Sequence, residues 1–138
     1  MNDPVIEFAS HEQLNKCLAE WQERLFLSDW IIKASLCEPH EMSDGDRYGE
    51  CAAGYTKKDA SILIMDRRFF PDNAIERYCA EQVLVHELLH CKYVGYEKQC
   101  PTIEECFFDV SQHALLEQMA KSLIMAKYNL PYSWFRNF

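Results

Sequence analysis

The sequence has no apolar run that approaches the roughly 20 residues of a membrane-spanning helix, so no transmembrane segment is expected. Glycine and proline are also scarce, with four and five residues respectively, which leaves little room for disordered segments. No linker, internal repeat or low-complexity tract interrupts the chain. Because 138 residues is an ordinary domain length, these absences predict one folded domain over residues 1–138.

Basic residues are outnumbered and do not cluster. Fourteen Lys and Arg against 22 Asp and Glu give a formal net charge of −8, and no run of basic residues is longer than two. Nucleic-acid-binding proteins usually carry a basic patch, and anionic membranes attract polybasic segments. The composition therefore predicts that neither nucleic acid nor a membrane surface is a partner.

No pair among the seven cysteines has the Cys-x-x-Cys spacing, which argues against a zinc ribbon or a thioredoxin-like redox site. The first eight residues contain two acidic residues and no hydrophobic run, unlike a secretory signal peptide. We therefore predict a cytoplasmic protein whose thiols are reduced and mostly buried.

Hydrophobic periodicity and turn residues predict a helix, three strands and two further helices. The predicted ranges are 10–27 for the first helix, 30–37, 48–56 and 61–66 for the strands, 73 to about 95 for the second helix and 102 to about 128 for the last. Ser10 with Gln13, and Asn73 with Glu76, are candidate capping boxes. This order predicts an α+β domain with a three-stranded, mostly antiparallel sheet and helices packed on one face.

The most specific signal is His-Glu-Leu-Leu-His at residues 86–90, on the second predicted helix. Four residues is slightly more than one helical turn, so His86 and His90 project from the same face and can supply two ligands of a tetrahedral zinc site. Glu87 can act as general base on a water bound there. From the His and Glu frequencies, the motif would arise by chance in about 2% of such sequences.

A catalytic zinc site needs a third protein ligand. A longer form of the motif adds a glycine three residues and a third histidine six residues after the second histidine. It is absent here, because positions 93 and 96 are both tyrosine. The last predicted helix offers Glu117, which would complete a two-His-one-Glu set, and His113 one turn earlier. We predict Glu117 as the ligand, with His113 as the alternative ligand or as a residue that supports the site.

Several segments strengthen this interpretation. A predicted helix followed by an Asp-Trp strand occupies residues 21–25 and 28–32. A strand at 61–66 precedes the motif helix, and a later helix carries an acidic residue within 115–117. Together with residues 83–91, this pattern resembles the compact gluzincin-like metallopeptidases, including short phage-associated metallopeptidases and SprT-like proteins. The resemblance implies a zincin fold, a Zn²⁺ cofactor, a peptide or protein substrate and a sheet edge that holds an extended peptide. SprT-like proteins use a third histidine and often a basic nucleic-acid-binding surface, and this acidic chain does not match the second feature.

Two functions follow from these observations. The first is a zinc-dependent metallopeptidase with Glu87 as general base, and the alternative is a catalytically inactive zinc-binding interaction domain of the same fold. Glu87 favours the enzyme, because a structural site does not need that carboxylate. A closed site with both His113 and Glu117 bound would favour the interaction domain. Tyr93, Tyr96, Tyr128 and Tyr132 are candidates to hydrogen-bond an oxyanion, and Cys91 is predicted to be a buried thiol.

Overall fold

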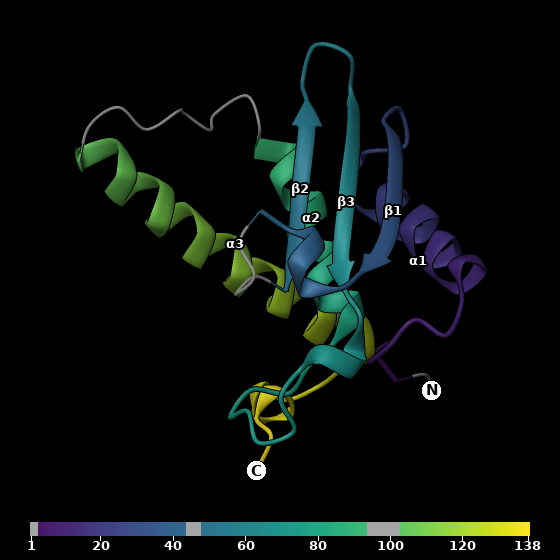
Figure 1. Cartoon of the computed structure of the whole chain (residues 1–138), viewed down its shortest axis with the longest axis vertical. Helices are drawn as coiled ribbons and strands as arrows, with labels where there is room; N and C mark the ends of the chain where they lie inside the picture. The colour runs from purple at the N-terminus through teal and green to yellow at the C-terminus, as the bar shows by residue number, and fades with distance from the viewer. Residues whose placement is uncertain (1–2, 44–47, 94–102) are drawn as a thin grey trace.

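The computed structural model describes residues 3–43, 48–93 and 103–138, with only the backbone for 103–111. Three helices and three strands follow in the order α1 (His11–Arg24), β1 (Ile31–Cys37), β2 (Gly49–Gly54), β3 (Asp59–Met65), α2 (Ala80–Tyr93) and α3 (Ile103–Tyr128) (Figure 1). Short 3₁₀ turns occupy Pro39–Glu41, Arg67–Phe69 and Tyr132–Phe135. The α+β class and the order of elements are confirmed.

Helix α1 begins where its sequence predicts. The Ser10 side chain accepts a hydrogen bond from the Gln13 backbone N–H at 3.1 Å, which satisfies one of the free amides of the first turn. The Gln13 side chain reaches back to the backbone N–H of Ala9 at 2.6 Å, one residue earlier than in a standard capping box. The cap therefore forms with a shifted partner.

The sheet is mixed, so the expectation of a mostly antiparallel sheet is wrong. Strand β3 lies in the centre, pairs in parallel with β1 from Ile31↔Asp59 to Cys37↔Met65, and pairs antiparallel with β2. A tight turn joins β2 to β3, with Lys58 at a φ of 53°, and this hairpin explains the antiparallel pair. After β1 the chain passes to the other side of β3 before it forms β2, so β3 lies between the two strands and β2 is at an edge of the sheet.

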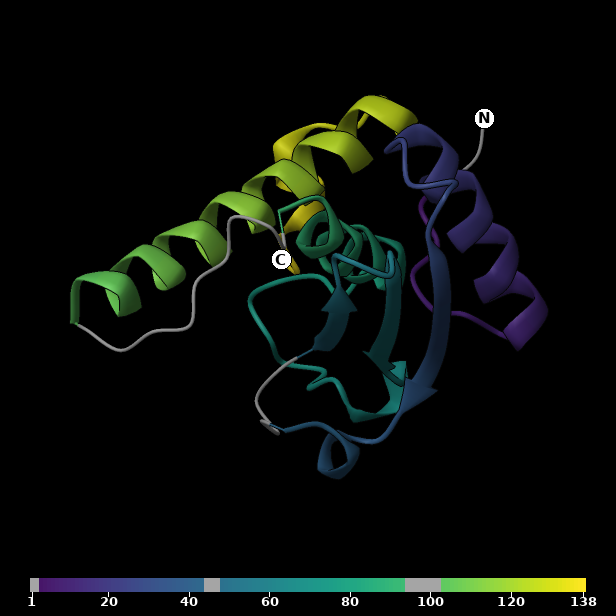
Figure 2. The same ribbon diagram turned by 90° about the horizontal axis from the view of Figure 1, so that it is seen from above.

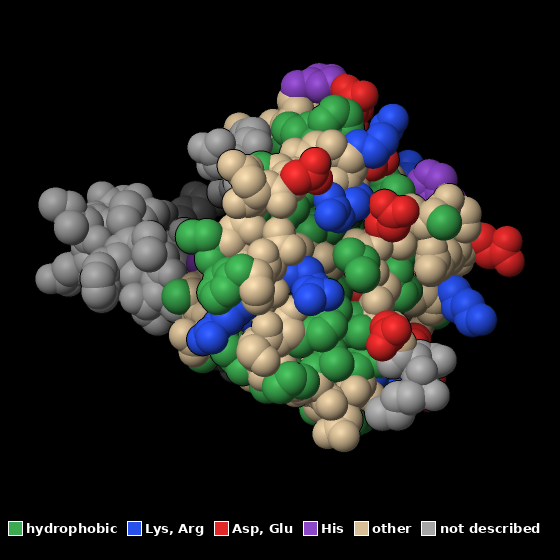
Figure 3. Space-filling model, turned by 90° about the horizontal axis from the view of Figure 1, so that it is seen from below, with side chains coloured by type: hydrophobic (Ala, Val, Ile, Leu, Met, Phe, Trp, Pro, Cys, Tyr) green, Lys and Arg blue, Asp and Glu red, His purple; other side chains and the backbone are tan. Residues whose placement is uncertain are grey.

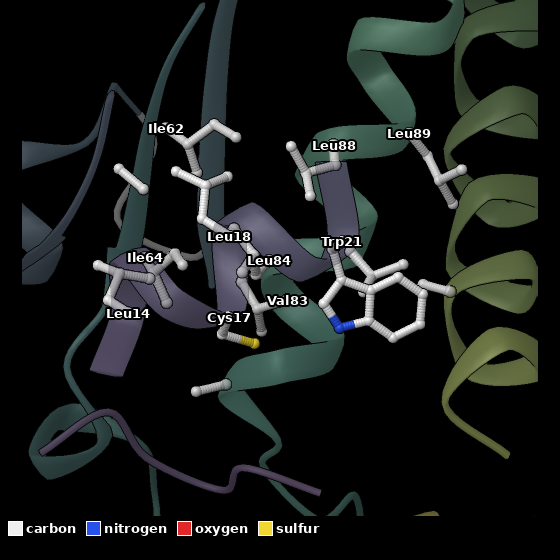
Figure 4. Close-up of a cluster of buried hydrophobic side chains, with 14 of the residues drawn as sticks. Leu14, Cys17, Leu18, Trp21, Ile62, Ile64, Val83, Leu84, Leu88 and Leu89 are labelled. Atoms are coloured by element: carbon white, nitrogen blue, oxygen red, sulfur yellow. The ribbon is translucent and has the colours of Figure 1, made fainter. Parts of the chain in front are cut away.

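All three helices lie on one side of the sheet, with α2 next to the strands and α3 farther out (Figure 2). Their shared core contains Leu14, Cys17, Leu18 and Trp21 from α1, Ile62 and Ile64 from β3, and Val83, Leu84, Leu88 and Leu89 from α2 (Figure 4). Almost every side chain of α2 is buried, since α1, α3 and two strands all pack on it. The motif helix is therefore the centre of the fold.

Helix α2 begins at Ala80, seven residues after the predicted Asn73 cap, so that boundary is wrong. The preceding segment pairs with the C-terminal tail instead of coiling. The Arg77 N–H donates to the Phe135 carbonyl and the Asn137 N–H donates to the Ile75 carbonyl, both at 2.7 Å. The first amides of α2 donate to backbone carbonyls near the N-terminus, which replaces the predicted side-chain cap.

Other sequence expectations have mixed outcomes. Of the cysteines whose side chains are described, none forms a disulfide, and Cys91 is buried as predicted. Cys100, Gly95 and Thr102 lie outside the described residues, as does the Cys106 side chain. None of the helices in the described ranges combines the length and apolar composition that a membrane crossing requires. On the face seen in Figure 3, basic and acidic side chains are interspersed rather than gathered by sign.

Candidate metal centre

Three histidines from two helices line one cavity. His86 and His90 come from α2 and His113 comes from α3. Their ring centroids are 5.2 Å apart for His86 and His90, 6.0 Å for His86 and His113, and 4.6 Å for His90 and His113. One ring nitrogen from each lies within 4.8 Å of the other two. This triad can hold a metal ion.

The positions of the three histidines follow from helix geometry. His86 and His90 are four residues apart, so both project from the same face of α2. His113 lies on the same stripe of α3 as Leu116 and Ala120, which are fully buried. Because α3 packs against α2, this stripe brings His113 up to the α2 pair. The motif and the helix packing together assemble the triad.

The donor set suits a small transition-metal ion. At a tetrahedral zinc ion with bonds near 2.0–2.1 Å, ligand nitrogens lie about 3.3 Å apart, and the three ring nitrogens lie within 4.8 Å of one another without an ion. Imidazole nitrogens bind zinc, copper, iron and nickel, whereas magnesium and calcium prefer oxygen ligands. Three imidazoles also leave a coordination position for water.

Glu117 contacts a histidine of the triad and is not part of the donor cluster found among the described residues. Its Oε2 lies 3.3 Å from His86 Nδ1, and its Oε1 accepts a hydrogen bond from Gln82 Nε2. Burial favours neutral Glu117, but the contact with His86, the Lys121 charge and the Gln82 hydrogen bond outweigh it and lower the Glu117 pKa. The carboxylate is therefore ionised and orients His86 through Nδ1, which leaves His86 Nε2 for a metal.

The same contact acts on His86. Burial disfavours the imidazolium, but the hydrogen bond with Glu117 and the charges of Glu87 and Glu117 more than offset it and raise the His86 pKa. Two carboxylates therefore make the environment of the imidazole anionic, which also favours a bound cation.

Glu87 lines this cavity and is only 6% exposed. It lies beneath the edge strand at Gly49, where the backbone approaches closely. A Cβ at position 49 would lie 2.8 Å from Glu87 Oε2 and 2.7 Å from Val83 Cγ1. Glycine is therefore required for β2 to pack directly over the carboxylate.

Gly49→Ala should destabilise the protein by about 1–3 kcal/mol, because the added methyl group overpacks the contact with stiff, buried Val83. Urea unfolding gives the change in free energy. Gly54→Ala in the same strand is the matched control, since its Cβ would meet only the end of the Asp59 side chain, at 2.9 Å. Equal effects of the two substitutions would contradict the close packing at Gly49.

The cavity measures about 280 Å³ and is lined by Tyr48, Gly49, Gln82, Val83, His86, Glu87, His90, His113 and Glu117. All five residues predicted for the site, His86, Glu87, His90, His113 and Glu117, therefore meet in one place. Sequence reasoning missed Tyr48, Gly49 and Gln82 at this site. Tyr48 and Gly49 lie at the start of a predicted strand, and this position is the sequence signal that could have indicated them.

None of the tyrosines proposed from sequence that the structure describes lines this cavity. The Tyr128 hydroxyl donates to buried Glu81 at 2.6 Å, and Tyr132 packs beside Phe135 in the C-terminal turn. Tyr93 is not among the lining residues, and Tyr96 lies outside the described residues. Cys91 follows His90, and its sulfur lies 3.8 Å from the sulfur of Cys51 on β2.

Comparisons of the chain with protein-family models, with curated proteins and with solved structures find no match. Function is therefore inferred from the motif and from the geometry of the cavity.

Proposed function

We propose that this protein is a zinc-dependent metallopeptidase with a zincin-type fold. The observation that carries the proposal is the convergence of three imidazoles and one buried glutamate, Glu87, on a single cavity. Imidazole triads bind zinc in known catalytic sites, and a carboxylate beside them is the usual general base of zinc hydrolases. A purely structural site has no need of that carboxylate.

For the ligand set we propose His86, His90 and His113, in place of the set with Glu117 predicted from sequence. The close grouping of their nitrogens supports this choice. Both oxygens of Glu117 already have protein partners, Gln82 and His86, and such contacts are typical of groups that orient a metal-binding histidine. Glu117 therefore supports the site from behind His86.

When bound, a zinc ion lowers the pKa of a coordinated water to about 7 and polarises a carbonyl group. The protein supplies the proton transfers. Glu87 takes a proton from the attacking water and delivers it to the leaving amine, which is general base followed by general acid catalysis. Its shielded position under β2 keeps the carboxylate near the site of attack.

A peptide is the substrate class that best fits the surroundings of the cavity. Strand β2 lies at an edge of the sheet, and Gly49 of this strand lines the cavity with the histidines. A strand edge presents unpaired backbone groups that an extended peptide can pair with. A peptide added along β2 would pass over Glu87 and the triad.

The zinc ligands are tested by comparing His113→Ala with Glu117→Gln. We expect one zinc per wild-type chain and a loss of affinity well above 100-fold for His113→Ala, because a ligand is removed. Glu117→Gln should lose only the roughly 10–100-fold typical of groups that orient a ligand. Elemental analysis and competition with a chromophoric chelator measure both. The reverse ranking would assign Glu117 as the ligand, and wild-type protein that stays free of zinc after reconstitution would refute the site.

Activity tests the rest of the proposal. Hydrolysis of fluorescein-labelled casein should stop with 1,10-phenanthroline and return when zinc is added in excess. A zinc-loaded protein that cleaves neither casein nor a broad peptide library would favour the alternative, an inactive zinc-binding interaction domain.

A further inference from the structure

Tyr48 is a cavity residue to which neither the metal nor the proton transfer assigns a role. It immediately precedes β2 and lines the cavity together with the triad and Glu87. The cavity is small, about 280 Å³, so a carbonyl group bound at the triad comes within reach of the side chains that line it. Tyr48 is the one tyrosine among the described residues that line this cavity, and its side chain is partly exposed.

Aromatic packing and the sheet hold Tyr48 in place. The backbone N–H of Met65 donates to the Tyr48 carbonyl at 2.9 Å, which continues the pairing of β2 and β3. The Tyr48 ring meets the ring of Phe70 edge-on, at 5.1 Å between centroids, and Phe70 in turn packs at 5.0 Å on Tyr78. Phe70 and Tyr78 are both buried, so the Tyr48 ring rests on the core while its own surface stays partly exposed.

The cavity needs a hydrogen-bond donor. Hydrolysis of a peptide bond places negative charge on the carbonyl oxygen, and a hydrogen-bond donor aimed at that oxygen stabilises the charge. Gln82 Nε2 is already engaged with Glu117. The Tyr48 hydroxyl has no hydrogen-bond partner within the part of the chain that the structure describes.

We propose that the Tyr48 hydroxyl donates a hydrogen bond to the carbonyl oxygen of the scissile peptide bond and stabilises the charge that develops there. This inference rests on the proposed peptidase function. Burial, with the nearby charges of Glu76 and Glu117, raises the Tyr48 pKa, so the hydroxyl keeps the proton that it donates. Tyr48 is then a substrate-binding residue contributed by the strand that receives the peptide.

The test is the affinity of the zinc-loaded protein for acetohydroxamate, a small anion whose oxygens bind zinc, measured by calorimetry. Tyr48→Phe keeps the ring and its packing on Phe70 and removes only the hydroxyl. We expect it to weaken acetohydroxamate binding about 10- to 100-fold, as the loss of one hydrogen bond to a charged acceptor does, with zinc affinity unchanged. Tyr55→Phe, at the exposed turn between β2 and β3, is the matched control and should have no effect.

The outcomes distinguish a failure of the proposed Tyr48 role from a failure of the proposed peptidase function. Equal acetohydroxamate affinity in wild type and Tyr48→Phe, with zinc bound to both, would overturn the role of Tyr48 and leave the peptidase proposal intact. Loss of zinc or of folded protein in Tyr48→Phe, seen in the zinc titration and by circular dichroism, would assign the hydroxyl to the structure of the site and also overturn it. A wild-type chain that binds no zinc would remove both proposals together.

Discussion

Glu87→Gln should lower peptide hydrolysis by at least the roughly 10²–10⁴-fold that general acid–base catalysis contributes. Glutamine has nearly the same size and can still hydrogen-bond, but it cannot accept a proton from the attacking water. The side chain is outside the proposed ligand set of three histidines. Zinc content and the free energy of unfolding should therefore stay near their wild-type values, while kcat falls.

The decisive measurement is kcat for labelled casein at saturating zinc, alongside zinc content and urea unfolding. Glu117→Gln is the matched control, because it makes the same chemical change at another carboxylate of the cavity. With zinc supplied in excess it should keep most of its activity. Unchanged turnover in Glu87→Gln would remove Glu87 from the mechanism, and loss of zinc would make it a residue of the metal site instead.

Local signals predicted most of the fold. Ser10 capped α1, and the three strands formed within two residues of the expected bounds. Two errors came from distant partners. The segment before α2 pairs with Phe135 and Asn137 of the C-terminal tail. Strand β1 pairs in parallel with β3, and β2 lies on the other side of β3. No pattern inside either segment encodes those partners.

The candidate site also has a part that the sequence predicts and a part that depends on long-range packing. His86, Glu87 and His90 are linked by a fixed helical spacing, so the sequence alone brought them together. His113 and Glu117 are one turn apart on α3, and the spacing along that helix fits either as a third ligand. The way α3 packs on α2 places His113 in the donor cluster and Glu117 against His86, and that packing is a long-range property. Tyr48 joins the cavity for a similar reason, through the placement of an edge strand.

A buried carboxylate at the start of α2 joins the helices that position this site. Glu81 is fully buried and its two oxygens accept four hydrogen bonds. Oε1 accepts from the Val5 N–H at 3.0 Å and the Tyr128 hydroxyl at 2.6 Å. Oε2 accepts from Trp21 Nε1 at 2.7 Å and Lys127 Nζ at 2.8 Å. The residue therefore links α1, α2, α3 and the N-terminal segment.

Glu81→Ala should destabilise the protein by about 3–5 kcal/mol, the usual cost of removing one partner from a buried charged pair. Four donors would lose their acceptor, and Lys127, only 13% exposed, would keep one carboxylate partner among the described residues, Glu20 at 2.9 Å. Burial disfavours charge on Lys127, but its hydrogen bonds with Glu81, Tyr128 and Glu20 raise its pKa, so its ammonium group stays charged at neutral pH. Urea unfolding at pH 7 measures the loss.

Glu20→Ala is the control that separates burial from charge. It removes the other carboxylate partner of Lys127, but Glu20 is 42% exposed, and exposed ion pairs contribute about 0–1 kcal/mol. A domain with about 5–15 kcal/mol of total stability tolerates that change easily, whereas Glu81→Ala would remove a large share of it. If both substitutions cost less than about 1 kcal/mol, water replaces the lost carboxylate and the network does not hold the helices together. A large loss confined to Glu81→Ala would make this buried carboxylate, on the helix turn before His86, the main polar anchor of the helix that carries the histidine pair.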